Sequence, residues 1–201
     1  MTLQEQVAAL LPERRGHFAF ESGHHGRVWL DLELLFLHPE RIEPLASVLA
    51  ERLRPLQPEV VCGPLVEGAF VALRVASCLG VPFSYSEPTR TAPATDAGLF
   101  PVSYPIPEAL HDELRDRRVV VVNDVINAGS AVRGTLTSLD ACGAKPVAVG
   151  TLAVYGEAAG RLAESHSVAL ETLASYPSEI WEPGSCPLCA ECVPLWQQAG
   201  S

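Results

Sequence analysis

Hydrophobic residues recur along the chain with two different spacings, one helical and one typical of strands. Residues 3–14 place Val7, Leu10 and Leu11 on one face of a helix, and Pro12 stands near its end. Other apolar runs are short, rich in valine or aromatic residues, and bounded by glycine, proline or polar residues. By these criteria we predict strands at 18–20, 28–30, 60–62, 83–86, 119–122 and 146–155, and further helices at 39–53, 69–79 and 130–142.

The alternation of strands and helices predicts an α/β fold. Strands separated by helical segments form right-handed βαβ units, so we expect a mainly parallel sheet with helices on both faces. The chain has 201 residues and 48% hydrophobic content, which suffices for one sizeable core but is short for two. We therefore expect a single domain over residues 1–201.

Residues 87–107 interrupt this alternation. The sequence EPTRTAPATDAGLFPVSYPIP contains five prolines and three threonines and has little periodicity. Connections of this length within a compact domain are often lids over a functional site. We expect a long surface loop or an extended flap, the alternative being a solvated excursion without a role.

The charge balance excludes some functions. The formal net charge is −10, and Lys145 is the only lysine. Binding to nucleic acid irrespective of its sequence needs a basic surface, so we expect no nucleic-acid partner. No run approaches the roughly 18 apolar residues of a membrane span, and we expect a cytoplasmic protein without a membrane partner.

The sequence RRVVVVNDVINAGSAVRGT at residues 117–135 is the most informative. A valine run leads into Asn123 and Asp124, and small residues follow before the helix expected from Ser130. In open parallel sheets, ligands bind at the carboxyl ends of strands, where the next helix offers unpaired N–H groups to an anion. Asp124 could accept hydrogen bonds from two sugar hydroxyls while residues 127–131 hold a phosphate. A phosphorylated ribose fits this arrangement, and neither GxxxxGK[ST] nor GxGxxG after a strand occurs.

This stretch resembles the phosphoribosyl diphosphate (PRPP) binding signature of the type I phosphoribosyltransferases, and its AGSAVR portion is most similar to the orotate phosphoribosyltransferases. Two further segments are similar to the same family. FAFESGHHGRVWLD at 18–31 resembles the pattern that helps to form the base pocket. VVCGPLVEGAFVALRVASCLGVPFSYSE at 60–87 resembles the strand, turn and helix that receive the pyrophosphate. The three segments occur in the family's order.

The resemblance implies a type I phosphoribosyltransferase fold with a small N-terminal base-binding hood, roughly residues 1–35, a mobile loop at 87–107 and a Cys-rich tail at 181–201. It implies a Mg²⁺-dependent glycosyltransferase that joins PRPP and orotate to give orotidine 5′-phosphate and pyrophosphate, in pyrimidine synthesis, and usually a homodimer. Asp124 is then catalytic and the residue nearest Mg²⁺, which would be held mostly through substrate. The residues implied for PRPP are Asn123, Asp124, Asn127, Ala128, Gly129, Ser130, Ala131, Gly63, Pro64, Glu67 and Gly68; those implied for the base are Ser22, Gly23, His25, Arg27 and Arg133.

Several residues depart from the family pattern. Asn123 replaces the first acidic residue of the PRPP signature, and Glu67 lies in the turn expected to receive an anion. The loop at 87–107 has no lysine or histidine, so we assign the missing catalytic cation to Arg90, with Arg27 or His25 as further candidates. Two alternatives stay open: a phosphoribosyltransferase for another base, and a protein that senses PRPP or a nucleotide without turnover.

The cysteines fall into two groups. Three lie singly in apolar surroundings and are expected to be packing residues. Cys186, Cys189 and Cys192 form CPLCAEC, whose two C-x-x-C spacings could supply three thiolates to zinc. A structural zinc site needs a fourth ligand, and no histidine or cysteine follows nearby. The alternative is a set of reduced thiols in a tail.

Overall fold

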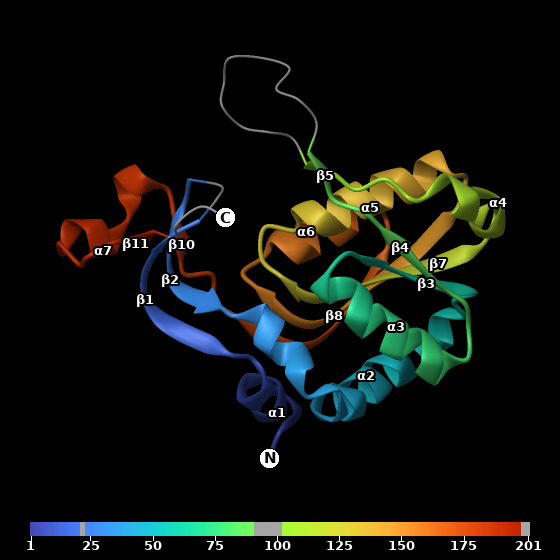
Figure 1. The fold of residues 1–201 in the computed structure, drawn as a ribbon, viewed down its shortest axis with the longest axis horizontal. Coiled ribbons are helices and arrows are strands. Elements are labelled where there is room, and N and C mark those ends of the chain that lie inside the picture. The colour runs from blue at the N-terminus through green and yellow to red at the C-terminus, as the bar shows by residue number, and fades with distance from the viewer. Residues whose placement is uncertain (21–22, 91–101, 198–201) are drawn as a thin grey trace.

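The central element of the computed structural model is a five-stranded parallel sheet (Figure 1). The structure describes residues 1–20, 23–90 and 102–197. The strand order is β4-β3-β7-β8-β9, so β3 pairs with β4 on one side and with β7 on the other. The strands are β3 (Val60–Pro64), β4 (Phe83–Ser86), β7 (Arg118–Ile126), β8 (Lys145–Tyr155) and β9 (Ala169–Tyr176). The predicted parallel α/β fold is confirmed.

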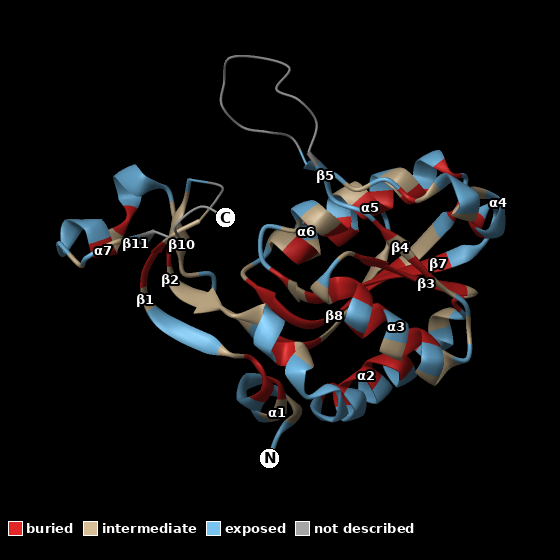
Figure 2. Cartoon of the chain, viewed as in Figure 1, coloured by how far each residue is buried: buried red, intermediate tan, exposed pale blue. Residues whose placement is uncertain are grey.

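Helices cover both faces of this sheet, and their inward faces are buried (Figure 2). Residues such as Leu49 and Val75 pack against one face, and Leu136 and Leu162 pack against the other. The first face is covered by α1 (Leu3–Leu10), η1 (Leu32–Leu37), α2 (Pro39–Leu53), η2 (Arg54–Leu56) and α3 (Glu67–Leu79). The second is covered by η3 (Glu108–Leu110), α4 (His111–Leu114), α5 (Ser130–Ala141) and α6 (Ala158–Ser165). No helix among the described residues is long and apolar enough to cross a bilayer.

A second sheet, which we call the hood, combines segments from both ends of the chain. Its order is β10-β2-β1-β11; β1 and β2 form an antiparallel hairpin, β10 pairs antiparallel with β2, and β11 pairs parallel with β1. The elements are β1 (Glu13–Ala19), β2 (His25–Leu30), β10 (Ile180–Trp181), η4 (Pro183–Ser185), α7 (Pro187–Ala190) and β11 (Trp196–Gln197). The Cys-rich tail is therefore part of the hood.

The segment predicted as a loop at 87–107 contains a short two-stranded ribbon. Strand β5 (Thr89–Arg90) pairs antiparallel with β6 (Val102–Ser103). Thr89 lies opposite Ser103, and Arg90 lies opposite Val102. The rest of the predicted loop, residues 91–101, lies outside the described residues.

Three sequence predictions differ from the structure. The first helix ends at Leu10 rather than at residue 14, because the ring of Pro12 keeps Leu11 extended, with ψ at 121°. Helix α1 packs on the main core, so the hood begins with β1 rather than at residue 1. Strand β7 continues to Ile126, so Asp124 lies inside a strand rather than at its tip.

Candidate active site

The strand order predicts a ligand site between β3 and β7. The chain winds from β3 outward to β4 and then returns to β7, so the direction of winding reverses between β3 and β7. In open parallel sheets, ligands bind at the carboxyl ends of the strands at such a switch point. The turn after β3 leads into α3, and the turn after β7 leads into α5. These are the two turns that the sequence predicted to bind PRPP.

The turn after β7 is shaped to accept an anion. Gly129 is the N-cap of α5, has φ at 76°, and offers no side-chain oxygen to the first N–H groups of the helix. Those N–H groups and the helix dipole favour a negative charge at this end. Asn127, Ala128 and Ser130 are exposed beside it. The residues predicted to form the phosphate cradle, NAGSA, therefore lie at a solvent-accessible helix N-terminus.

A cavity of about 660 Å³ opens at this cradle. It extends from the end of β7 across the start of α5 to the start of α6, and the hood closes one side. Its lining residues are Phe20, His24, Asn123, Val125, Ile126, Asn127, Ala128, Gly129, Ser130, Ala131, Val132, Tyr155, Gly156, Glu157, Ala158, Arg161, Ser178 and Ile180. All five predicted phosphate-loop residues are thus in one cavity.

A smaller, mostly apolar pocket of about 210 Å³ lies beneath the hood. Phe20 and Trp29, which are stacked with ring centroids 5.8 Å apart, form part of its wall. Val125, Asn127 and Tyr155 line this pocket and the larger cavity alike, so the two are adjacent. Aromatic walls suit a planar ligand, and the pocket is placed to hold a base next to a phosphorylated ribose.

Asn123 and Asp124 occupy different environments. The Asn123 side chain lines the large cavity and donates from Nδ2 to the carbonyl oxygen of Val125, 2.7 Å away. Asp124 is buried, does not line that cavity, and its Oδ2 has no hydrogen-bond partner within the described part of the chain. Burial, with a contribution from the Glu67 charge, raises the pKa of Asp124 to about 7. Asn123, although buried, is therefore the residue of this pair that lines the cavity.

The turn after β3 approaches Asn123 closely. A Cβ atom on Gly68 would collide with Asn123 Oδ1, and one on Gly63 would lie 2.5 Å from the Cβ of Ala72. Glycine at both positions therefore lets the start of α3 pack against the ends of β3 and β7. Pro64 ends β3, and Glu67 is the first residue of α3. The predicted pyrophosphate turn thus approaches Asn123, but its residues do not themselves line the cavity.

The predicted cationic and base-binding residues are spread more widely. Arg133 is exposed on α5 and does not line either cavity. Arg27 Nε lies 3.3 Å from Glu179 Oε1, and Glu179 lines the apolar pocket. Arg90 ends β5, at the base of the ribbon. Gly23 has φ at 78° in the hood turn, while Ser22 lies outside the described residues.

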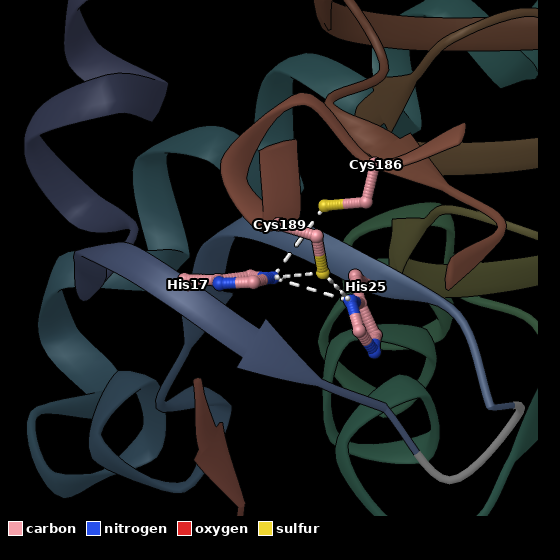
Figure 3. Close-up of side chains that lie close together, drawn as sticks. All are labelled: His17, His25, Cys186 and Cys189. Atoms are coloured by element: carbon pink, nitrogen blue, oxygen red, sulfur yellow. Dashed lines mark hydrogen bonds between the residues drawn. The ribbon is translucent and has the colours of Figure 1, made fainter. Parts of the chain in front are cut away.

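His25 lies beside the tail cysteines rather than among the predicted base-binding residues. His25 contacts Cys189, and the group also includes His17 and Cys186 (Figure 3). The neighbouring His24 lines the large cavity, so the two adjacent histidines have different surroundings. Cys192 is exposed and lies outside this group, beyond the end of α7 at Ala190. The three-cysteine set predicted from the sequence is therefore replaced by two cysteines and two histidines.

Several residues of the site were not predicted from the sequence. Tyr155 and Arg161 lie at and after the end of β8, beside β7 in the sheet. Glu179 and Ile180 belong to the segment that enters the hood. Tyr155 could have been found, because the carboxyl end of the next parallel strand must lie beside the phosphate loop. Ile180 could not, since its strand has only two residues and no periodic signal.

Comparisons with known proteins agree with this geometry. Residues 36–185 match the family described as Phosphoribosyl transferase domain. The chain is 30% identical over 182 residues to the orotate phosphoribosyltransferase of Carboxydothermus hydrogenoformans, covering 90% of this chain and 87% of that one. A crystal structure of orotate phosphoribosyltransferase from Aeropyrum pernix is 25% identical, with a TM-score of 0.65 over 87% of this chain and 93% of that one. An adenine phosphoribosyltransferase from Rhodothermus marinus shares the fold, with a TM-score of 0.67 at 17% identity over 86% of this chain and 98% of that one.

Proposed function

This chain belongs to the phosphoribosyltransferase family, within which it is related to the orotate phosphoribosyltransferases, and we propose that it transfers the 5-phosphoribosyl group of PRPP to orotate. The products are orotidine 5′-phosphate and pyrophosphate, and the place of the reaction is pyrimidine synthesis. The observation that carries the proposal is the uncapped N-terminus of α5, which opens into a cavity that adjoins an aromatic pocket. A phosphate site beside a base site is what this substrate pair requires.

Each part of the substrates has a matching part of the site. The N–H groups of residues 128–131 and the Ser130 hydroxyl bind the 5′-phosphate. The Asn123 amide faces the ribose, and the turn after β3 receives the pyrophosphate. Phe20 and Trp29 hold the base in the orientation for attack at C1 of the ribose. The transition state resembles an oxocarbenium ion, so positioning and electrostatic stabilisation provide most of the catalysis.

A magnesium ion fits the charges at the end of β7. Asp124 Oδ2 is buried and unpaired within the described residues, and the Glu67 carboxylate is near enough to raise the Asp124 pKa. Neither carboxylate has an ion pair with another described residue, and such a pair of charges attracts a divalent cation; oxygen ligands are those that Mg²⁺ prefers. Asp124 and Glu67 do not line the cavity, so they would attract the ion by their charge while substrate oxygens supply most of its ligands. The ion would neutralise negative charge on the leaving pyrophosphate.

A homodimer is part of the proposal. Exposed apolar side chains gather on η1 and the adjacent α3, and we call them the α3 patch. Phe36 of η1 and Phe70 of α3 pack edge to face with ring centroids 5.1 Å apart, which joins the two elements. Exposed apolar patches of this kind favour association. The residues of the α3 patch are Leu34, Leu37, Val66, Phe70 and Leu73.

The cysteines support a cytoplasmic location as part of the same proposal. All six are free, and free thiols persist where the surroundings are reducing.

The decisive experiment is an assay of pyrophosphate release from PRPP and Mg²⁺ with orotate, uracil, hypoxanthine, adenine or guanine as acceptor. Turnover confined to orotate is expected. Turnover with another base would change the acceptor but keep the reaction. Stabilisation of the fold by PRPP without pyrophosphate release on any base would instead indicate a sensor.

Two arginines provide a matched pair of variants for the same assay. Both side chains are exposed, but only Arg161 lines the cavity, where its Nη1 lies 2.9 Å from Glu157 Oε2. Arg161→Gln is expected to raise the KM for an anionic substrate about tenfold, the effect of about 1.4 kcal/mol. Arg133→Gln should have a smaller effect. The reverse ranking would assign the orotate carboxylate to Arg133, as the family resemblance implies.

A further inference from the structure

Four potential metal ligands lie together in the hood. They are far apart in the sequence, so no local motif reveals the group. His17 comes from β1, His25 from the start of β2, and Cys186 and Cys189 from the tail around α7 (Figure 3). One ligand atom of each residue lies within 4.8 Å of the ligand atoms of the other three. His17 is 3% exposed and Cys186 is 4% exposed, so half of the cluster is deeply buried.

Four of the six separations between the ligand atoms are close to the edges of a tetrahedron around one zinc ion. With Zn–N of about 2.0–2.1 Å and Zn–S of about 2.3 Å, those edges are roughly 3.3 Å between nitrogens and roughly 3.6 Å between nitrogen and sulfur. His17 Nε2 lies 3.2 Å from His25 Nδ1. The same nitrogen lies 3.4 Å from Cys186 Sγ and 3.7 Å from Cys189 Sγ. His25 Nδ1 lies 3.2 Å from Cys189 Sγ.

The tautomer of His17 also suits a metal. Its Nδ1 lies 2.8 Å from the carbonyl oxygen of Val193, and because a carbonyl only accepts, Nδ1 must carry the proton. A neutral His17 ring therefore directs the lone pair of Nε2 at the centre of the cluster. A backbone carbonyl that fixes the second ring nitrogen is the usual outer partner of a metal-bound histidine.

Hydrogen bonding alone satisfies this cluster poorly. One lone pair on His17 Nε2 faces three groups at 3.2–3.7 Å, and it can accept only one good hydrogen bond. One cation at the centre would engage all four groups. Two thiolates and two neutral imidazoles balance the charge of a divalent ion, so the complete site can be buried without net charge.

We propose that His17, His25, Cys186 and Cys189 bind one structural zinc ion that ties the C-terminal tail to the β1–β2 hairpin. Four protein ligands complete the tetrahedral shell and leave no open position for a substrate. Sulfur and nitrogen ligands in a tetrahedron select zinc over the oxygen-seeking Mg²⁺. The site also lies apart from the cavity lined by His24, so it acts on the shape of the hood.

The full chain, purified with a reducing agent and without chelator, is expected to contain about one zinc per chain by mass spectrometry of metals. Removal by a strong chelator should lower the melting temperature, and Zn²⁺ but not Mg²⁺ should restore it. A reduced chain that contains no zinc, and whose melting temperature Zn²⁺ leaves unchanged, would overturn the proposal. So would a disulfide between Cys186 and Cys189 in that chain.

Cys192 supplies a control within the same tail. Cys189→Ser should lose the zinc, while Cys192→Ser should keep it, because Cys192 lies outside the cluster. Cys189 is itself exposed, so the substitution leaves no buried cavity. Cobalt provides a second readout that does not depend on stability: the native chain should show tetrahedral Co²⁺ absorption with a thiolate charge-transfer band. Cys189→His should keep the tetrahedral spectrum and weaken that band. Equal zinc loss from Cys189→Ser and Cys192→Ser would contradict the assigned ligand set.

Discussion

At the scale of single residues, the charge of the buried Asp124 side chain is costly to the folded chain. Burial raises its pKa from 3.8 to about 7. Below about pH 4 both folded and unfolded chains hold the proton, so there is no penalty. Between those values the unfolded chain ionises and the folded chain does not, so stability falls as pH rises and the full penalty applies above pH 7. A shift of about three pKa units corresponds to about 4 kcal/mol.

Asp124→Asn should therefore stabilise the ligand-free protein at pH 8, by up to about 4 kcal/mol, and have little effect near pH 4. Urea unfolding followed by circular dichroism at both pH values measures the difference. The same variant should lose Mg²⁺-dependent PRPP binding, because the amide cannot replace the carboxylate. A stability gain of equal size at both pH values would show that the carboxylate charge is not its cause.

Asn123 stands where the family pattern has a carboxylate, and its amide makes a hydrogen bond of its own. Its Nδ2 donates to Val125, a bond that an aspartate could not make. Asn123→Asp should lower the free energy of unfolding by about 1–3 kcal/mol at pH 8, since it removes this bond and adds a charge near Asp124 and Glu67. Added Mg²⁺ and PRPP should recover part of the loss. Thermal unfolding with and without both ligands tests this, and a variant as stable as the parent without ligand would refute it.

At the scale of elements, the start of α5 depends on one backbone conformation. Gly129 has φ at 76°, and a Cβ there would lie 3.3 Å from Leu162 Cδ2. Gly129→Ala should cost about 1 kcal/mol of stability or more and displace the phosphate loop. We expect the KM for PRPP to rise about tenfold, the equivalent of about 1.4 kcal/mol.

Gly160 is the matched control for this substitution. It lies within α6, where a Cβ would meet nothing within 4 Å. Gly160→Ala should raise stability by about 0.5–1 kcal/mol through helix propensity and leave the KM for PRPP unchanged. Chemical denaturation and the pyrophosphate assay on both variants separate loop geometry from a general effect of added methyl groups.

The central sheet could be predicted from sequence because its strands and helices are local patterns. The valine run of β7 and the apolar spacing of α3 each identify their element within a dozen residues. The length of β7 was underestimated, because polar residues such as Asn123 and Asp124 are typical of the start of a turn. Both are buried in the structure. The loop at the start of α5 could be predicted because its small residues follow a strand directly.

The hood could not be predicted in full, because its pairings join distant parts of the chain. Phe18 pairs with Trp196, and His25 pairs with Trp181, in strands of two residues that have no periodicity. The proposed zinc ligands show the same difficulty, because His17 and Cys189 can be recognised as ligands only once the fold brings the two ends of the chain together. The C-x-x-C spacing was the one local signal, and it identified two of the four proposed ligands.

At the scale of the whole molecule, the α3 patch predicts self-association. Leu73 is 46% exposed within the patch, and Val48 on α2 is a similar exposed residue outside it. Leu73→Asp should convert a dimer into monomers, while Val48→Asp should leave the dimer intact. Light scattering coupled to gel filtration measures the mass of each. A parent chain that runs as a monomer at micromolar concentration would contradict this prediction.

The hood also makes intrinsic tryptophan fluorescence a probe of ligand binding. All three tryptophans of the chain, Trp29, Trp181 and Trp196, are in hood strands, and Trp29 forms a wall of the apolar pocket. Intrinsic fluorescence therefore reports mainly on the hood. An aromatic base that enters the pocket should quench the emission directly. PRPP alone should alter it only as far as the hood itself moves, so the order in which the two substrates bind can be followed without any label.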